Sequence, residues 1–594
     1  MIDFAEIGKT KYIEGVPASP GIVMGRAFIL DTERPHVSAE TIEPSQIEPE
    51  IAAFEDAIAD VKAQLVKLRS ALEDELGEEH ARIFDAHLMI LDDSMVVDGT
   101  VKRVREQKVS AALALTETIG SVTAAMSRTD DEYLRDRVFD IKDIERRLLV
   151  RLLGRKADSL KRLKDDVIVI AHQLAPTHTA SMHKERVKGF ATEAGGRTSH
   201  AAIMARSLEI PAVVGLGRVT DLIDQGESII VDGTLGLVVY QYDQAVLDYY
   251  LKRQKQYEEF EHSLLTLRDY PAVTRDGRKF ELAANIEIPD EVDSAISHGA
   301  EGIGLFRTEY LFIARDESPT EDEQYEAYRH VVEAMAPSSV VIRTLDVGGD
   351  KFGPRESGRK EENPFLGWRG IRYSLAKPDL FMRQIRAILR SSAHGNVRLM
   401  FPMISSLHEV RDAKQVVEAA RQELIARGQE FDEGAEVGVM IETPAAAVIA
   451  DLIADEVDFM SIGSNDLTQY ALAVDRGNDR VAYLYDEYHP AVLRLLEQTV
   501  RAAKRRRRWV GLCGEMAGNP LAVLLLIGLG LDELSTSPLM LPEVKSIIRA
   551  TSYNSARKTL LKAMGMKTGS EVRRYLEGIF RKKYPEISAT ELIT

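Results

Sequence analysis

The sequence predicts a multidomain α/β protein with a (β/α)8 barrel in its C-terminal half and an N-terminal α/β domain that carries an inserted helical bundle. Three observations lead to this prediction. The chain has 594 residues, more than a single hydrophobic core organises. After residue 45, apolar side chains recur at alternating spacings of four and three, as in bundle helices. Beyond residue 271, short apolar strand patterns alternate with helical patterns, as in a barrel.

The domain order follows from where these patterns change. Residues 1–30 and 155–241 are expected to form one α/β domain, and residues 31–154 form the bundle between its two parts. A charged helix at 242–270 is expected to link this half to the barrel, which occupies 271–594. The bundle is therefore an insertion in a domain whose strands come from both flanks.

Composition excludes several classes of protein. The net charge of −18 argues against a nucleic-acid partner, which would need a dominant basic face. The single cysteine, Cys513, rules out an intramolecular disulfide framework. There is no apolar run long enough to span a bilayer, and the N-terminus lacks the basic and apolar regions of a signal peptide. We therefore expect a cytoplasmic protein without a membrane partner.

Four helical segments predict the bundle. The first covers about 47–72, with a capping box expected at Ser45 and Glu48. The others are expected at 78–91, 97–126 and 131–153. Helices joined by short polar turns form an antiparallel bundle. Because we find no polar constellation in its seam, we interpret the bundle as a docking module, and the acidic chain suits a basic protein partner.

Strand patterns define the other two domains. The flanks of the bundle contribute apolar strands at 27–30, 167–170, 228–233 and 237–240 to the N-terminal α/β domain. Eight further strands are predicted for the barrel, at Leu282–Ile286, Gly302–Phe306, Val340–Thr344, Val397–Pro402, Val437–Ile441, Val457–Ile462, Trp509–Leu512 and Glu533–Ser535.

One histidine stands in a glycine-rich turn where a helical pattern begins. Gly195 and Gly196 allow tight backbone turns, and Thr198 and Ser199 are N-cap residue types. His200 follows them, and the N-terminus of a helix stabilises an anion such as a phosphoryl group. The alternative is a structural histidine buried at a turn.

Charged and polar side chains follow the predicted barrel strands, at the end where barrel enzymes place their active sites. These residues are Arg307, Arg343, Glu442, Asn465, Asp466, Arg476 and Cys513. Arginine forks bind phosphate and carboxylate groups, and two carboxylates facing an anion need a cation between them. We therefore predict Mg²⁺ at Glu442 and Asp466, and a small phosphorylated carboxylate as substrate.

Each of these residues also has a structural interpretation. Single arginines and acids in α/β loops are usually surface salt bridges, and a lone cysteine such as Cys513 is usually a small buried hydrophobe. At a strand end facing an enolate, however, its thiol could donate a proton to carbon. The basic run 504–508 could bind nucleic acid, but a solvated helix end before the strand at Trp509 is the favoured interpretation.

Several long motifs together resemble one family, Enzyme I of the bacterial phosphoenolpyruvate-dependent sugar phosphotransferase system, over essentially the whole chain. The motifs are Gly195–Arg206, Gly302–Glu309, Arg343–Lys351, Asn363–Arg369, Gly463–Tyr470 and Cys513–Gly518. The resemblance implies that His200 takes the phosphoryl group of phosphoenolpyruvate and passes it to a histidine of the carrier protein HPr, as the first step of sugar uptake.

The resemblance also implies roles for the other residues. It assigns phosphoenolpyruvate binding to Arg307, Arg343, Arg369, Asn465, Asp466 and Arg476. Glu442 and Asp466 would hold Mg²⁺, and Cys513 would protonate the enolate to pyruvate. Family members are homodimers through the barrel, and their helical insertion docks the carrier. The departures are Ala201 and Ala202 after the histidine, and a longer tail beyond Lys562.

Three rival functions remain at this stage. Phosphoenolpyruvate synthase and pyruvate phosphate dikinase share the histidine motif and the barrel, but they need an ATP-binding domain for which about 190 residues of mostly bundle leave no room. A nitrogen-related paralogue would carry an additional sensory domain ahead of the region near Gly15. A catalytically inactive scaffold would have no chemical need to keep the arginines, acids and cysteine together.

Overall fold

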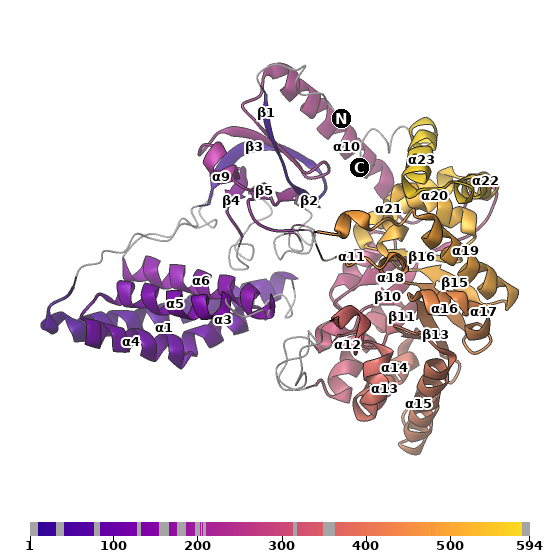
Figure 1. Cartoon of the computed structure of the whole chain (residues 1–594), viewed down its shortest axis with the longest axis horizontal. Coiled ribbons are helices and arrows are strands. Elements are labelled where there is room, and N and C mark those ends of the chain that lie inside the picture. Colours follow the sequence, from indigo (N-terminus) through magenta and orange to yellow (C-terminus); the bar gives the residue numbers. More distant parts are fainter. Residues whose placement is uncertain are drawn as a thin grey trace. The chain divides into compact units, whose positions relative to one another are not determined.

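The computed structural model describes residues 10–30, 41–76, 83–127, 132–153, 165–174, 186–196, 202, 205, 210–312, 318–348, 363–476, 478 and 480–584. The chain divides into two units between Glu259 and Phe260 (Figure 1). Among the described residues, no helix combines the length and the apolar composition that crossing a membrane requires.

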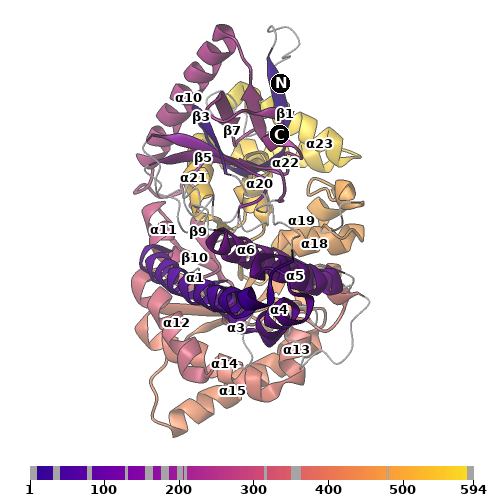
Figure 2. The same cartoon turned by 90° about the vertical axis from the view of Figure 1, so that its left-hand side faces the viewer.

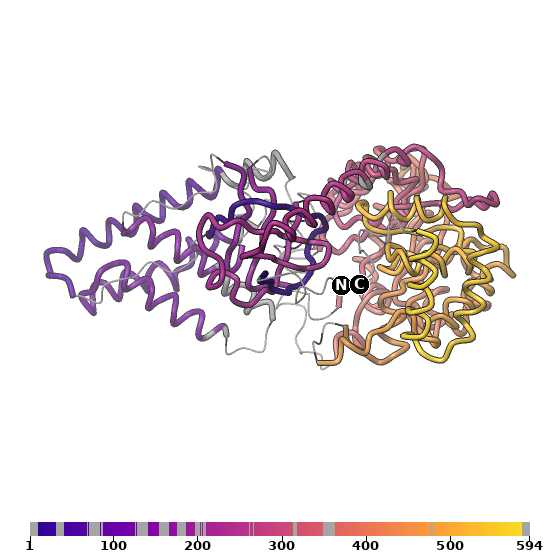
Figure 3. Tube along the Cα trace, turned by 90° about the horizontal axis from the view of Figure 1, so that it is seen from above, coloured from indigo at the N-terminus to yellow at the C-terminus, as the bar shows by residue number. Residues whose placement is uncertain are grey.

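In the part of the chain that the structure describes, five helices form the bundle of the first unit, and they lie side by side in Figures 2 and 3. They are α1 Ile47–Leu76, α3 Ile83–Asp92, α4 Ser94–Gln107, α5 Ala111–Ser127 and α6 Glu132–Leu152. Their seam buries Phe54 and Leu65 of α1, Leu115 of α5 and Leu148 of α6 completely. The predicted helical bundle is confirmed, because its 3.6-residue periodicity supplies one apolar face per helix.

Three details of the bundle differ from the prediction. The single helix expected at 97–126 is wrong, because Lys108 adopts a left-handed conformation (φ 51°) and ends α4 before α5 begins. The capping box expected at Ser45 and Glu48 is also wrong, because Glu43 and Gln46 form it two residues earlier. Polar side chains do enter the seam, since His87 and Glu145 are fully buried.

The strands of this unit form one eight-stranded sheet in the order β1-β8-β7-β3-β4-β5-β6-β2. The strands are β1 Lys11–Glu14, β2 Val16–Ser19, β3 Ile22–Ile29, β4 Val167–Ala171, β5 Val187–Thr192, β6 Ala212–Val214, β7 Ser228–Asp232 and β8 Leu237–Tyr240. Strands β3 and β4 flank the bundle in sequence yet pair directly in parallel, from Arg26 opposite Val167 to Ile29 opposite Ile170. Residues on both sides of the bundle thus share one sheet.

A closed parallel barrel forms the centre of the second unit, and each strand pairs with its neighbours in sequence. The strands are β9 Glu281–Ile286, β10 Gly302–Phe306, β11 Ser339–Arg343, β12 Asn396–Phe401, β13 Glu436–Ile441, β14 Phe459–Ile462, β15 Trp509–Leu512 and β16 Glu533–Thr536. All eight predicted strands are confirmed to within about two residues, the ordinary uncertainty of element ends.

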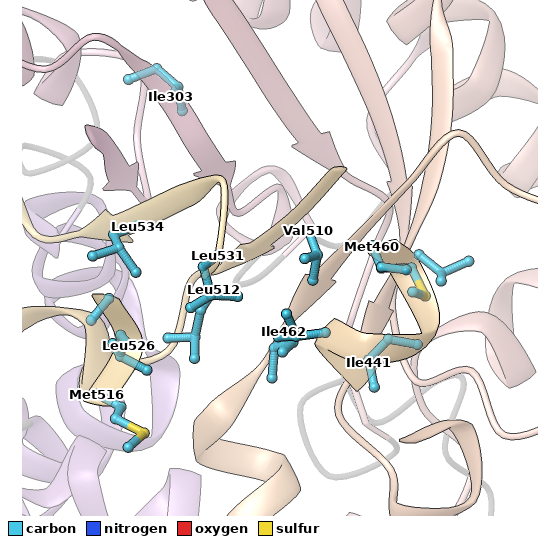
Figure 4. Packing of buried hydrophobic residues seen from close by; sticks show 14 of the residues in the cluster. Ile303, Ile441, Met460, Ile462, Val510, Leu512, Met516, Leu526, Leu531 and Leu534 are labelled. Atoms are coloured by element: carbon cyan, nitrogen blue, oxygen red, sulfur yellow. The ribbon is translucent and has the colours of Figure 1, made fainter. Parts of the chain in front are cut away.

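Helices surround the barrel. They are α11 Glu291–Ser297, α12 Glu321–Met335, α13 Ile371–Ala376, α14 Pro378–Ser391, α15 Leu407–Ala426, α16 Pro444–Val448, α17 Ala450–Ile453, α18 Ser464–Leu472, α19 Pro490–Arg505, α20 Pro520–Leu529, α21 Leu541–Ala550, α22 Tyr553–Met564 and α23 Gly569–Lys583. Figure 4 shows strand residues such as Leu512 and Leu534 in one buried layer with Leu526 of α20. Alternate strand positions point inward instead, where Leu305, Met440 and Phe459 fill the barrel.

The described part of the C-terminal tail beyond Lys562, residues 563–584, belongs to the barrel unit. Helix α23 buries Val572, Leu576 and Phe580 completely, in the same apolar layer that covers the strands. The basic run lies where α19 ends before β15, and three of its five cations are paired with acids: Lys504 with Asp532, Arg506 with Asp455 at 3.0 Å and Arg508 with Asp458 at 3.8 Å. This pairing agrees with a helix end rather than a nucleic-acid patch.

A buried carboxyl group on α21 predicts how the stability of the barrel depends on pH. Glu543 is 4% exposed, and its Oε1 has no hydrogen-bond partner among the described residues. Burial raises the pKa of Glu543 to about 8. The folded state therefore binds this proton more tightly than the unfolded state, so stability falls as the pH rises from about 4.5 toward 8.

We expect Glu543→Gln to remove this pH dependence, making the variant more stable than the wild type at pH 8 by a few kcal/mol. Urea unfolding at pH 5 and pH 8 measures it. Tryptophan fluorescence reports the barrel alone, because Trp368 and Trp509 both lie in the second unit. The exposed Glu430→Gln is the control. Equal pH profiles for Glu543→Gln and the wild type would contradict the prediction.

Candidate active site at the carboxyl ends of the barrel strands

The predicted barrel residues follow the carboxyl ends of five parallel strands. Arg307 follows β10, Arg343 ends β11, Glu442 follows β13, and Cys513 follows β15. Asn465 and Asp466 lie in the first turn of α18, directly after β14. Because the strands are parallel and neighbouring, their carboxyl ends lie on one rim of the barrel.

Two buried arginines lie at the centre of this rim. Arg343 Nη1 lies 3.2 Å from Asp346 Oδ2, and Arg343 Nη2 donates to Glu309 Oε1 at 3.0 Å. Arg369 donates through Nη2 to Asp346 Oδ2 at 2.8 Å and to Asp466 Oδ2 at 3.2 Å. Burial alone would lower the pKa of each guanidinium, but these carboxylates raise it well above its ordinary value. Both side chains therefore stay cationic.

Three carboxylates lie close to one another beside these arginines. Asp346, Glu442 and Asp466 each offer an oxygen, and these oxygens lie within 4.8 Å of one another. Burial, followed by the charges of Asp346 and Asp466, raises the pKa of Glu442 to about 8. Three oxygens at this spacing are the donor set that a hard divalent cation takes, and a cation would relieve their mutual repulsion. The residues present therefore fit Mg²⁺.

The backbone around Glu442 explains its position. Its Oε1 accepts a hydrogen bond from Met403 N–H at 2.5 Å. Gly463, at the end of β14, lies so close that a Cβ there would come within 2.9 Å of the Glu442 Cβ. A side chain at position 463 would therefore push β14 away from the carboxylate.

Helix α18 and the loop after it supply the next group. Arg476 Nη2 lies 3.9 Å from Asp466 Oδ1, and the backbone N–H of Arg476 donates to Gln469 Oε1 at 3.2 Å. The amide of Asn465 donates to Glu515 Oε1 at 3.1 Å and accepts from the Glu515 N–H at 2.9 Å. These contacts fix Asn465 and Arg476 on either side of Asp466.

Cys513 is buried at the end of β15. Its thiol donates to Ile462 O at 3.8 Å, and its carbonyl accepts a hydrogen bond from Asn285 Nδ2 at 2.9 Å. Burial raises the pKa of Cys513 to about 11. The sulfur therefore keeps its proton at neutral pH, as a proton donor must.

Two of the predicted site residues are not part of the contact network around Arg343 and Arg369. Arg307 pairs with Glu287, and no contact between Arg307 and the two central arginines is found among the described residues. His200 lies outside the described residues. Gly195, five residues before it, has φ 123°, a conformation that favours glycine, as expected for the turn.

The sequence reasoning missed three residues of the site. Asp346 contacts both central arginines, Glu309 accepts from Arg343, and Tyr470 Oη accepts from Arg369 Nη1 at 3.2 Å. Asp346 and Glu309 lie within the family motifs Arg343–Lys351 and Gly302–Glu309, each a few residues beyond the end of a strand. An inspection of every acid following a strand would have found both.

Sequence comparisons place this chain in a known family. Residues 14–137, 163–236 and 261–553 match, in turn, the N-terminal, mobile and PEP-binding domains of the PEP-utilising enzymes. The phosphoenolpyruvate-protein phosphotransferase of Bacillus sp. (strain S) is 44% identical over 96% of this chain and 99% of that protein. Its namesake from Haemophilus influenzae is 43% identical over 95% and 98%. The chain belongs to the phosphoenolpyruvate-protein phosphotransferase family.

The resemblance to the Enzyme I family is thus confirmed, and the chain is a phosphotransferase that acts in phosphoenolpyruvate-dependent phosphoryl transfer. The NMR solution structure of Enzyme I (nEIt) is 42% identical and covers 41% of this chain and 99% of that chain, with a TM-score of 0.37. In this phosphotransferase the PEP-binding match contains all eight barrel strands, and the mobile-domain match contains His200.

Proposed function

We propose that this phosphotransferase moves the phosphoryl group of phosphoenolpyruvate to its own His200 and then to a histidine of the carrier protein HPr, releasing pyruvate. This is the first step of phosphotransferase-system sugar uptake. One observation supports the proposal most strongly: two buried cationic arginines, Arg343 and Arg369, face three carboxylates whose oxygens lie within 4.8 Å of one another.

The arginines would bind the substrate. Phosphoenolpyruvate carries a phosphate and a carboxylate, and a guanidinium fork binds either group with two parallel hydrogen bonds. Arg343 and Arg369 are buried and keep their charge, so they suit the phosphate. Arg307, Arg476 and the amide of Asn465 lie at the more open edge of the rim, where they would orient the rest of the substrate.

Glu442 and Asp466 would hold Mg²⁺. When bound, the cation would supply positive charge that offsets these carboxylates and stabilises the charge developing on the enolate.

The chemistry proceeds in two steps. A nitrogen of His200 attacks phosphorus, the bond between phosphorus and the enol oxygen breaks, and its electron pair stays on that oxygen as an enolate. The Cys513 thiol then gives its proton to the terminal carbon of the enolate, which completes pyruvate. The raised pKa of Cys513 supports this assignment, because an acid that must protonate carbon has to remain a thiol beforehand.

The bundle would dock the carrier. Its acidic chain suits a basic partner, and HPr must reach His200, which belongs to the same half of the sequence. The resemblance to the Enzyme I family also supports a cytoplasmic homodimer formed through the barrel.

Direct detection of the phosphorylated chain tests the proposal. Incubation with phosphoenolpyruvate and Mg²⁺ should add about 80 Da, the mass of one phosphoryl group, to the intact chain. The adduct should be acid-labile and should disappear when HPr is added. Absence of an adduct from a folded protein would point to an inactive scaffold, and an adduct that forms only with ATP would point to the ATP-dependent relatives.

The linker helix α10, Gln244–Leu265, indicates where the two units hinge. Its first half is fixed to the N-terminal sheet, because Arg253 Nη1 forms a buried ion pair with Asp232 Oδ2 at 2.7 Å. Just beyond its C-terminus, Arg268 O accepts from Lys545 Nζ of the barrel unit at 2.7 Å. We infer that the segment 254–267 absorbs the motion between phosphorylation of His200 and its delivery to the carrier.

A cross-link between the units, made with engineered surface thiols while phosphoenolpyruvate is bound, tests this hinge. Because Cys513 is buried, the reagent should spare it. We expect self-phosphorylation to survive and transfer to HPr to fall at least about tenfold, since the histidine can no longer leave the barrel. If both half-reactions persist in the cross-linked protein, the hinge is wrong.

A further inference from the structure

Asp346 occupies the point where the two central arginines meet. Its side chain is 3% exposed. Oδ1 accepts from Arg369 Nε at 3.2 Å, and Oδ2 lies 2.8 Å from Arg369 Nη2 and 3.2 Å from Arg343 Nη1. One carboxylate therefore holds Arg369 through two nitrogens and Arg343 through a third, which is the bidentate geometry that fixes a guanidinium plane.

The backbone that carries Asp346 is itself held in place. Its N–H donates to Glu309 Oε1 at 3.0 Å, and the same oxygen accepts from Arg343 Nη2 at 3.0 Å. The amide of Gln384 accepts from the Leu345 N–H at 3.0 Å. These contacts leave little rotational freedom to Asp346 or Arg343, so the arrangement is organised before any substrate binds.

The three carboxylates of the rim are not equivalent. Both oxygens of Asp346 already face guanidinium N–H groups. In contrast, among the described residues Glu442 accepts one hydrogen bond, from the Met403 N–H, and Asp466 accepts from Arg369 Nη2 at 3.2 Å through Oδ2 alone, because Arg476 Nη2 lies 3.9 Å from its Oδ1. Oxygens facing cations on the protein are poor ligands for another cation, whereas Glu442 retains lone pairs for one.

We propose that Asp346 is a positioning residue that aligns the guanidinium groups of Arg343 and Arg369 for the phosphate of the substrate, and that it does not bind the cation. This inference rests on the proposed function of the same site. Asp346 acts through the arginines, which touch the substrate.

A role in charge balance and a role in positioning predict opposite effects of removing this carboxylate on phosphoenolpyruvate binding. If Asp346 only balanced charge, neutralising it would leave the site more positive and strengthen binding of an anion. If it positions the arginines, the amide of Asp346→Asn would turn an N–H donor toward a guanidinium, the two guanidinium groups would lose their alignment, and phosphate binding would weaken. The sign of the change in affinity therefore separates the two roles.

The test compares Asp346→Asn with its parent in a His200→Ala background, where phosphoenolpyruvate binds without being consumed. Calorimetry with saturating Mg²⁺ measures the Kd for phosphoenolpyruvate. Electron paramagnetic resonance measures Mn²⁺ binding with oxalate, a small dicarboxylate that has no phosphate. Asp412→Asn on the exposed face of α15 is the matched control. Glu309→Ala removes another acceptor of Arg343 and leaves the Asp346 side chain in place, so it tests the same alignment independently.

We expect Asp346→Asn to weaken phosphoenolpyruvate binding by about 30-fold, or about 2 kcal/mol, while Mn²⁺–oxalate binding stays within about twofold of the parent. Glu309→Ala should shift both readouts in the same directions. Unchanged or tighter phosphoenolpyruvate binding would overturn the inference, as would an equal loss of Mn²⁺ binding, which would make Asp346 a cation ligand. A parent that binds no phosphoenolpyruvate would instead refute the proposed function.

Discussion

Replacing His200 with alanine is expected to abolish phosphorylation of the chain by phosphoenolpyruvate. Alanine has no nucleophile, and the barrel residues only bind and polarise the substrate, so no other group completes the transfer. We expect the rate of adduct formation to fall by more than about 10⁴-fold. Intact-mass measurement at neutral pH after incubation with phosphoenolpyruvate and Mg²⁺ reports it, and loss of phosphoryl transfer to HPr should accompany it.

Two controls make this result specific. His408→Ala, on the exposed face of α15, removes another of the 13 histidines and should leave the adduct unchanged. Phosphoenolpyruvate should still bind the His200→Ala variant, because the binding residues belong to the barrel. An adduct that persists in His200→Ala would show that a different histidine receives the phosphoryl group, and the proposed route would be wrong.

Replacing Glu442 with glutamine should remove the response to Mg²⁺. Glutamine keeps the carbonyl oxygen that accepts from Met403 N–H, but it lacks the negative charge that a cation needs. We expect phosphorylation at saturating Mg²⁺ to slow by about 10³-fold or more, since the cation stabilises the charge of the enolate. Initial rates of adduct formation across a Mg²⁺ titration measure the change.

The stability of this variant should set it apart from a misfolded protein. Burial raises the pKa of Glu442 to about 8, so the folded barrel holds a neutral carboxyl group at neutral pH when no cation is bound, and a neutral amide resembles it. Glu442→Gln should therefore unfold at or above the urea midpoint of the wild type. Activity with a normal Mg²⁺ midpoint would contradict a ligand role for Glu442.

Local patterns were sufficient to predict most of the architecture. Each barrel strand is a short apolar run whose alternate residues face two buried layers. This pattern can be recognised from the local sequence, without knowing which strands pair. The break between α4 and α5 could not be predicted from the sequence. Helices often end at a glycine in the left-handed conformation, but here a lysine, Lys108, adopts it. The capping box was misplaced by two residues for a similar reason, since Glu43 is not a typical N-cap residue.

The residue types at the strand ends predicted the candidate site because parallel strands carry their carboxyl ends to one rim, whatever the loops do. The chain alone therefore indicated arginines, acids and a thiol near one another. Which carboxylate faces which cation was decided only by the tertiary structure. Arg369 lies 23 residues from Asp346 and 97 residues from Asp466 in sequence, yet it contacts both carboxylates within 3.2 Å. The physical reason is that a charge removed from water is costly unless an opposite charge lies beside it, and only the folded chain brings these residues together.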